Sequence, residues 1–236
     1  MRIRYHGHAC FEFVNESGRS LLFDPYKPDA LGGRFQLPPV EASPDWIAIT
    51  HYHEDHCWLQ PEWADTPVLD ENLETPDIRV EAIPTYHDGE SCGTRMGLSI
   101  ALRVHFGGMD IVHLGDINEQ LSSAALQALE KPAVLLLPVG GTYTFGPEEG
   151  LAIANLLKPT WIVPMHAADP RIDLPLEPLS SFFELWEGPV CDIENKAWET
   201  TLSQPGEQST LLPLYPRGFP QEDHGEGSVN LPGEIE

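Results

Sequence analysis

The chain has 236 residues, enough for one large domain with its own core or for two small domains that share one. Its formal net charge of −24 argues against binding to nucleic acid or to anionic membranes, because like charges repel. No apolar run approaches the roughly 20 residues of a membrane span, and the first residues lack the apolar core of a signal peptide. We therefore expect a cytoplasmic protein without a membrane segment.

The first half of the chain is expected to form short strands separated by turn residues. The candidate strands, in chain order, are 3–5, 10–14, 20–23, 46–50, 78–83, 97–105 and 109–114. Residues 24–44 contain Asp-Pro-Tyr, Gly-Gly and Pro-Pro, and they are expected to form a long loop of the kind retained for binding.

The second half alternates between helices and buried strands. Helices are expected over 118–130, 147–157 and 179–186, and apolar strands over 133–137 and 161–163. Strands followed by strand–helix alternation favour sheets covered by helices on the outside. We expect one domain over residues 1–200 and an acidic tail rich in Pro and Gly over 201–236. The apolar patch 211–215 can still dock on the body.

A dense group of histidines follows the strand at 46–50. His51, His53 and His56 lie with Asp55 within six positions. Neutral imidazoles offer lone pairs to borderline metals, whereas protonated ones at this density would repel one another. His51 and His53 lie two apart and project to the same side, while Asp55 and His56 follow where the chain turns. This arrangement predicts two metals, and the alternative is a polar surface loop that is rich in histidine.

Three further ligand candidates each follow an apolar run: His87, Asp116 and His166. A single histidine after a strand is more often a hydrogen-bonded structural residue. Their joint occurrence after the histidine-rich motif favours side chains that meet in one cleft at a sheet edge. The four cysteines show no CxxC spacing, so neither a disulfide framework nor a cysteine–zinc site is expected. Cys57 either lies near the metals or fills a small buried space.

These motifs resemble the metallo-β-lactamase-fold hydrolase superfamily over about residues 1–190. All seven metal-ligand positions of that superfamily are filled, by His51, His53, Asp55, His56, His87, Asp116 and His166. Shorter motifs at 7–11, 23–25 and 114–116 resemble the branch that includes L-ascorbate-6-phosphate lactonase. The resemblance implies an α+β fold, namely a four-layer αββα sandwich with a metal cleft at one edge of the two sheets.

The resemblance also implies how the ligands divide between two divalent ions. The first ion would be held by His51, His53 and His87, the second by Asp55, His56 and His166, and Asp116 would bridge them. Zinc is the expected metal, and manganese and iron accept the same ligands. Two ions about 3.5–4 Å apart lower the pKa of a water between them, so a bridging hydroxide is the expected nucleophile. Asp55 is the expected catalytic residue, which orients the hydroxide or passes a proton to the leaving group.

Three other residues are candidates for contacts around the metals. His8 would touch the substrate or support a ligand, or else make a structural hydrogen bond. Asp24 would accept the second N–H of a ligand histidine. Tyr143, or Thr142 beside it, would line the substrate pocket and donate a hydrogen bond.

The expected function is metal-dependent hydrolysis of an ester-like bond in a small molecule: a lactone, a phosphodiester or a thioester. An RNA-processing nuclease of the same fold is the alternative hydrolase, against which the acidic charge argues. A flavin-dependent di-iron redox protein is disfavoured because His53 is intact, and a binding module because no ligand is lost. A β-lactamase is disfavoured because no export signal is visible. Whether the chain forms a homo-oligomer stays open.

Overall fold

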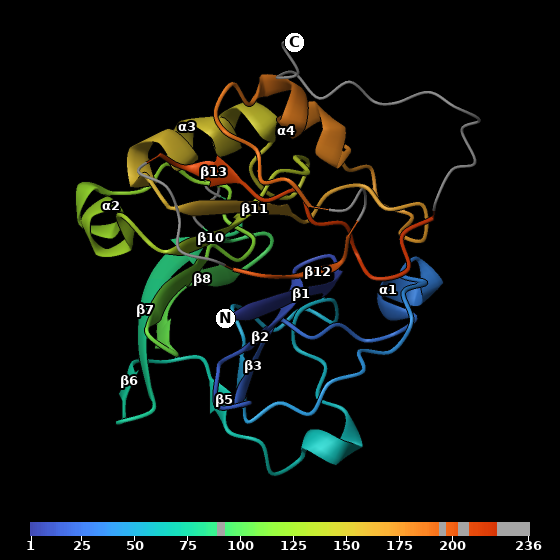
Figure 1. The fold of residues 1–236 in the computed structure, drawn as a ribbon. Coiled ribbons are helices and arrows are strands. Elements are labelled where there is room, and N and C mark those ends of the chain that lie inside the picture. Colours follow the sequence, from blue (N-terminus) through green and yellow to red (C-terminus); the bar gives the residue numbers. More distant parts are fainter. Residues whose placement is uncertain (89–92, 194–196, 203–207, 221–236) are drawn as a thin grey trace.

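The computed structural model describes residues 1–88, 93–193, 197–202 and 208–220, which form two β-sheets packed face to face (Figure 1). The six-stranded sheet has the spatial order β12 (Glu199–Thr201), β1 (Arg2–Gly7), β2 (Cys10–Val14), β3 (Ser20–Phe23), β4 (Trp46–Ala48), β5 (Val68–Leu69). The seven-stranded sheet has the order β13 (Thr210–Leu211), β11 (Trp161–Met165), β10 (Val134–Pro138), β9 (Met109–His113), β8 (Leu98–Phe106), β7 (Ile78–Tyr86), β6 (Leu73–Glu74). Both sheets are mixed, because hairpins join their antiparallel strands and longer crossovers their parallel ones.

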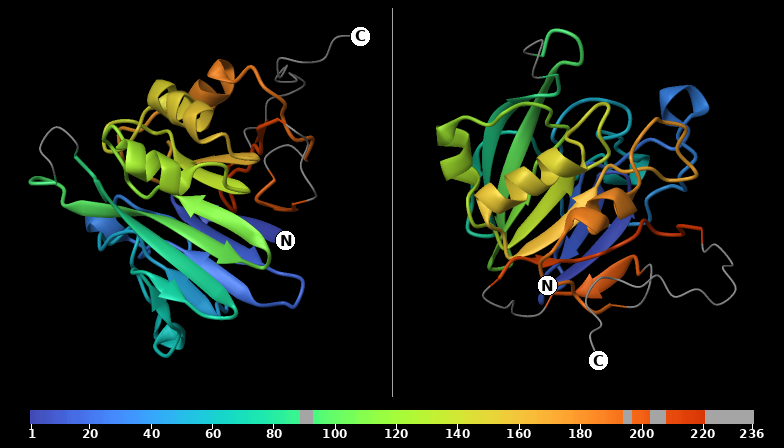
Figure 2. Two further views of the ribbon diagram at one scale, coloured as in Figure 1. Left: turned by 90° about the vertical axis from the view of Figure 1, so that its left-hand side faces the viewer. Right: turned by 90° about the horizontal axis from the view of Figure 1, so that it is seen from above.

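Helices cover the outer face of the seven-stranded sheet. They are α2 (Ser123–Leu129), α3 (Pro147–Leu157) and α4 (Leu179–Leu185), and Figure 2 shows them together on that side. The outer face of the six-stranded sheet is covered by loops with the short α1 (Ala30–Gly33) and the single 3₁₀ turn η1 (Pro61–Trp63). The expected α+β sandwich is confirmed, and its fourth layer is built mainly from loops.

The alternation of side chains along the strands explains the layers. In β2, Phe11 and Phe13 point between the sheets, whereas Cys10 points to the outer loops. In β10, Val134 and Leu136 likewise point inward, while Leu135 and Leu137 meet the helices. Both faces of β10 are therefore covered, which is why its sequence is apolar throughout.

Most predicted elements are present, and the differences have local causes. The helix at 147–157 has the predicted bounds. The helix predicted over 118–130 begins only at Ser123, because the Ser122 hydroxyl caps it by accepting a hydrogen bond from Ala125 N. The strand predicted over 46–50 ends at Ala48. The short strands β5, β6, β12 and β13 were not predicted, because two or three residues carry too little periodicity.

Part of the expected C-terminal tail packs on the body. β13 pairs in parallel with β11, and Leu211, Leu212 and Leu214 are fully buried. The apolar patch therefore docks, which was one of the outcomes expected for it. The division at residue 200 stays a prediction, because 203–207 and 221–236 lie outside the described residues.

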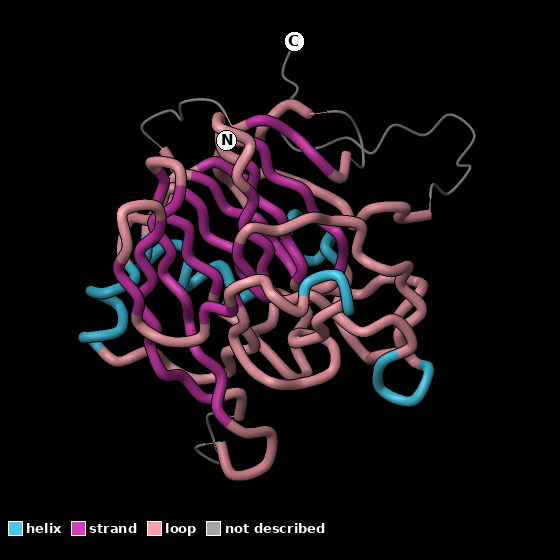
Figure 3. The backbone as a smooth tube through the Cα atoms, turned by 90° about the horizontal axis from the view of Figure 1, so that it is seen from below, coloured by secondary structure: helices cyan, strands magenta, loops and turns pink. Residues whose placement is uncertain are grey.

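The arrangement of the strands places functional side chains at their ends. Figure 3 shows the strands in the middle of the molecule with loops around their ends.

Within the described residues, no helix has the length and apolar character needed to cross a membrane.

Candidate metal centre

The predicted ligands come together around the carboxylate of Asp116, which follows β9. Its Oδ2 atom lies 3.1 Å from Nε2 of His166, 3.3 Å from Nε2 of both His56 and His87, and 3.9 Å from Nε2 of His51. These histidines follow β11, β4 and β7, so the loops at the ends of strands from both sheets converge on one carboxylate.

The remaining side chains form one group on each side of Asp116. His51, His53 and His87 make the first group, whose ligand atoms lie within 4.8 Å of one another. The second group consists of His8, Asp55, His56 and His166, again within 4.8 Å. The structure thus brings all seven predicted ligand residues together, and two of its groups match the division expected for two ions, with His8 added to the second. A third group, Asp24, His51 and His56, crosses that division.

The donor atoms fit metal ions because they lack other partners. Among the described residues, eleven buried side-chain nitrogen or oxygen atoms have no hydrogen-bond partner, and eight of them belong to this cluster. These eight atoms are Nδ1 and Nε2 of His8, Nε2 of His51 and His56, Nδ1 of His87 and His166, and Oδ1 of Asp55 and Asp116. Buried polar atoms are almost always paired, and cations bound between these side chains would pair one nitrogen of each imidazole and one oxygen of each carboxylate.

Asp24 contacts two of the candidate ligand residues or their neighbours from the side away from Asp116. This fully buried residue follows β3, and its Oδ2 lies 2.9 Å from Nδ1 of His56. Thr50 donates to the same carboxylate twice, from its backbone N (2.8 Å) and from Oγ1 (2.6 Å). Oγ1 of Thr50 lies 3.1 Å from Nδ1 of His51. With a metal ion on Nε2, the remaining proton of His51 and of His56 would sit on Nδ1, facing these oxygen acceptors.

His113 fixes the turn that carries Asp116. Its Nε2 lies 3.0 Å from the carbonyl oxygen of Ala9, and its Nδ1 accepts a hydrogen bond from Gly115 N at 3.0 Å. Both nitrogens are thus engaged, as expected for a structural histidine. Gly115 has φ 60°, and a Cβ there would lie 2.5 Å from Oγ of Ser99. The turn therefore needs glycine.

Three residues of the centre have left-handed backbone conformations. The φ angles are 56° for His8, 41° for Asp24 and 52° for His166. Residues other than glycine rarely adopt this region, and such strain concentrates at functional sites where the surroundings enforce it. The conformations turn these side chains inward directly after their strands.

Burial sets the protonation of the cluster before any cation binds. Burial and the neighbouring His166 lower the pKa of His8 to about 4. Burial and His56 lower the pKa of His51 to about 3. Burial alone would raise the pKa of Asp116, but His166 and His56 outweigh it and hold the pKa well below its ordinary value. Near neutral pH, His8 and His51 therefore offer lone pairs, and Asp116 is ionised.

A pocket of about 270 Å³ opens onto the centre. Its lining includes the apolar side chains Leu31, Met96 and Leu174, together with Arg34 and Tyr143. Five residues of the centre also line it: His53, Asp55, His87, Asp116 and His166. Tyr143 thus lies where it was predicted. Thr142 does not take the alternative role, because its hydroxyl donates to the carbonyl oxygen of Pro175 at 2.6 Å.

Several contacts of the centre were not predicted. Thr50 links Asp24 to His51, and only its place as a hydroxyl residue directly before the ligand motif could have suggested this role. Arg34 was included only as part of the loop 24–44. Cys57 is partly buried, packs against the apolar cluster over the six-stranded sheet and joins neither metal group.

Comparison with known proteins agrees with this geometry. The sequence-family model described as the beta-lactamase superfamily domain matches residues 2–166. The chain belongs to this superfamily. A UPF0173 metal-dependent hydrolase of Thermococcus onnurineus is 30% identical over 207 residues, covering 72% of this chain and 89% of the relative. Another from Methanoculleus marisnigri is 28% identical over 190 residues, covering 70% and 80%.

Solved structures share the fold. A protein of Thermotoga maritima described as a candidate zinc-dependent hydrolase of the metallo-β-lactamase superfamily has a TM-score of 0.68 at 24% identity, covering 89% of this chain and 97% of that chain. An isothiocyanate hydrolase from gut bacteria of Delia radicum has a TM-score of 0.58 at 16% identity, covering 78% and 91%. The protein is therefore a metal-dependent hydrolase of the metallo-β-lactamase superfamily. Its placement in the ascorbate-6-phosphate lactonase branch stays a prediction.

Proposed function

We propose that this hydrolase holds two divalent ions, zinc in the first place, and cleaves an ester-like bond of a small molecule. The observation that carries the proposal is the cluster of unpaired buried donor atoms on both sides of Asp116. One ion would bind His51, His53 and His87, and the other Asp55, His56 and His166, with Asp116 between them. Borderline ions such as zinc, manganese and iron suit this mixture of imidazoles and carboxylates.

The bound ions would supply an activated water as nucleophile and a positive field for the developing oxyanion. The side chains would position the water and keep the ligands in place. Asp55 lines the pocket, and its Oδ1 has no partner among the described residues, so it can orient the attacking water or pass a proton to the leaving group. Asp24 and Thr50 keep His56 and His51 in the orientation that faces the ions.

The pocket supports a small substrate with an apolar part and an acidic group. Its volume of about 270 Å³ suits a small molecule, and Leu31, Met96 and Leu174 offer apolar contacts. Arg34 is the cation in the lining, and its guanidinium has no hydrogen bond or ion pair to the part of the chain that the structure describes. An arginine left unpaired in a chain of net charge −24 can bind a carboxylate or phosphate of the substrate. Tyr143 would provide a further hydrogen bond.

A nuclease of the same fold is the alternative. The small volume of the pocket and the net charge of −24 favour a small molecule over a polyanion. A location in the cytoplasm and a homo-oligomeric state stay predictions.

Metal analysis combined with an activity panel tests the proposal. The purified protein should contain close to two metal ions per chain and should hydrolyse members of a panel of lactones, phosphodiesters and thioesters. His53→Ala should abolish both metal loading at the first site and hydrolysis. His105→Ala is a matched control, because this exposed histidine pairs with Asp110 outside the cluster. Activity that persists in metal-free protein would refute the proposal, and cleavage of structured RNA in place of small esters would favour the nuclease.

A further inference from the structure

His8 lies in the turn between β1 and β2, and its ring is buried without a hydrogen bond. Its side chain has no exposed surface, and neither Nδ1 nor Nε2 has a hydrogen-bond partner within the described part of the chain. A buried imidazole that only fills space would leave two polar atoms unpaired, which is costly. A metal ion bound to one of the two nitrogens would remove part of that cost.

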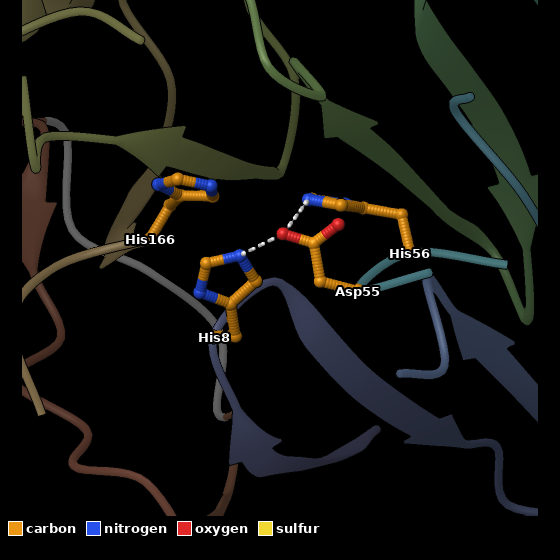
Figure 4. A group of neighbouring side chains, drawn as sticks. All are labelled: His8, Asp55, His56 and His166. Carbon is orange, nitrogen blue, oxygen red and sulfur yellow. Dashed lines mark ion pairs between the residues drawn. The ribbon is translucent and has the colours of Figure 1, made fainter. Parts of the chain in front are cut away.

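The ring lies in the second ligand group, as Figure 4 shows. Its Nε2 is 3.2 Å from Oδ2 of Asp55, yet the two atoms are not aligned as a hydrogen bond. Two nitrogen or oxygen ligands, each about 2.0–2.2 Å from one zinc ion, lie roughly 2.8–3.1 Å apart at a right angle and roughly 3.3–3.6 Å apart at the tetrahedral angle. The ring centroid is 3.9 Å from that of His166 and 5.2 Å from that of His56. The 3.2 Å separation of Nε2 and Oδ2 lies in the range for two ligands of one cation, and the neighbouring rings place His8 beside the other imidazoles of the group.

The backbone of His8 joins the same group. Its carbonyl oxygen accepts hydrogen bonds from His166 N at 2.9 Å and from the Tyr5 hydroxyl at 2.8 Å. His8 (φ 56°) and His166 (φ 52°), which this backbone hydrogen bond joins, both have left-handed backbone conformations. The two ends of strands from different sheets are thereby held together with both imidazoles turned into the cleft.

We propose that His8 is a direct ligand of the second metal ion, which would then be held by the three imidazoles of His8, His56 and His166 together with Asp55 and Asp116. This inference rests on the proposed two-metal function. With His8, the second site would have more protein ligands than the first. The second site would thus favour ions that accept five or six ligands, such as manganese or iron, over an ion held tetrahedrally.

A cobalt titration of metal-free protein tests the inference. Visible absorption of Co²⁺ reports the coordination number, and isothermal titration gives a Kd for each site. The wild-type protein should bind two ions. His8→Asn tolerates the left-handed backbone and removes the imidazole, so it should bind the first ion with unchanged Kd. It should bind the second at least about 100-fold more weakly, with an altered spectrum, since loss of a residue behind a ligand already costs about 10–100-fold.

Each outcome separates the two proposals. Unchanged affinity and spectrum of the second ion in His8→Asn would overturn the role of His8 while leaving the two-metal function intact. Fewer than two ions in the wild-type protein would refute the two-metal function itself. His8→Gln should behave as His8→Asn does, and it replaces that variant if metal-free His8→Asn does not unfold cooperatively. The control His6→Gln changes a buried histidine on β1 outside both metal groups and should leave both Kd values unchanged.

Discussion

Replacing Asp24 by asparagine tests how the centre is held from behind. The carboxylate accepts three hydrogen bonds, two from Thr50 and one from Nδ1 of His56, and it is fully buried. The asparagine side chain would have nearly the same shape but only one acceptor oxygen. If its amide nitrogen replaced Oδ1, the backbone N of Thr50 would lose its acceptor. If it replaced Oδ2, the hydroxyl of Thr50 and the ring of His56 would lose theirs.

The expected losses follow from this count. At least one buried donor is left unpaired, which costs about 1–3 kcal/mol of the free energy of unfolding. His56 also loses the acceptor that holds its Nδ1 proton and its orientation. Metal affinity at the second site should therefore fall about 10–100-fold, while the first site loses less.

Two measurements separate the effects. Urea unfolding of metal-free protein gives the change in stability, and competition with a chelator gives the metal affinity. Asp110→Asn is the matched control, because Asp110 also lies 2.9 Å from Nδ1 of a histidine, His105, but outside both ligand groups. It should leave the metal affinity unchanged. Wild-type affinity in Asp24→Asn would refute the idea that Asp24 orients His56.

Three further predictions concern stability and the pocket. Burial alone would raise the pKa of Glu12, but contacts with His6, Arg4 and Ser20 outweigh it and lower the pKa from 4.5 to about 2. The resulting stabilisation of the folded state, about 2–3 kcal/mol, is present above pH 4.5 and is lost as the pH falls toward 2. In urea unfolding, the difference in free energy of unfolding between wild type and Glu12→Gln should therefore shrink from pH 6 to pH 3. A constant difference would contradict this. Gly140→Ala would place a Cβ 1.9 Å from the carbonyl oxygen of His166. It should lower the free energy of unfolding by about 3 kcal/mol and weaken metal binding. A variant as stable as wild type would show that the backbone of this loop can shift to accept the Cβ. Arg34→Ala should raise KM for an acidic substrate about 10-fold with little change in kcat, since a charge-assisted hydrogen bond is lost, and an equal rise for a neutral analogue would exclude the pairing.

The sequence singled out the candidate ligands because their chemistry leaves a local signal. His51, His53 and Asp55 stand in one short motif, and His87 and His166 each follow an apolar run, so strand ends and metal chemistry point to the same residues. The structure then places these ends side by side. The hydrogen bonds that hold the ligands depend on contacts between distant segments, which a single sequence does not specify.

The contacts of Thr50 and the membership of His8 in the second ligand group illustrate what could not be predicted. Thr50 contacts Asp24 across two strands, and that contact depends on the parallel pairing of β3 and β4. His8 enters the second group only because its backbone adopts a left-handed conformation against His166. The loop covering the six-stranded sheet, with its short α1, likewise lacks any periodic pattern from which its path could be deduced.

Anomalous X-ray diffraction from crystals grown with zinc tests the two-metal centre most directly. We expect two peaks about 3.5–4 Å apart with the carboxylate of Asp116 between them, one beside His51, His53 and His87 and the other beside Asp55, His56 and His166. A single peak, or zinc bound away from Asp116, would contradict the two-metal centre.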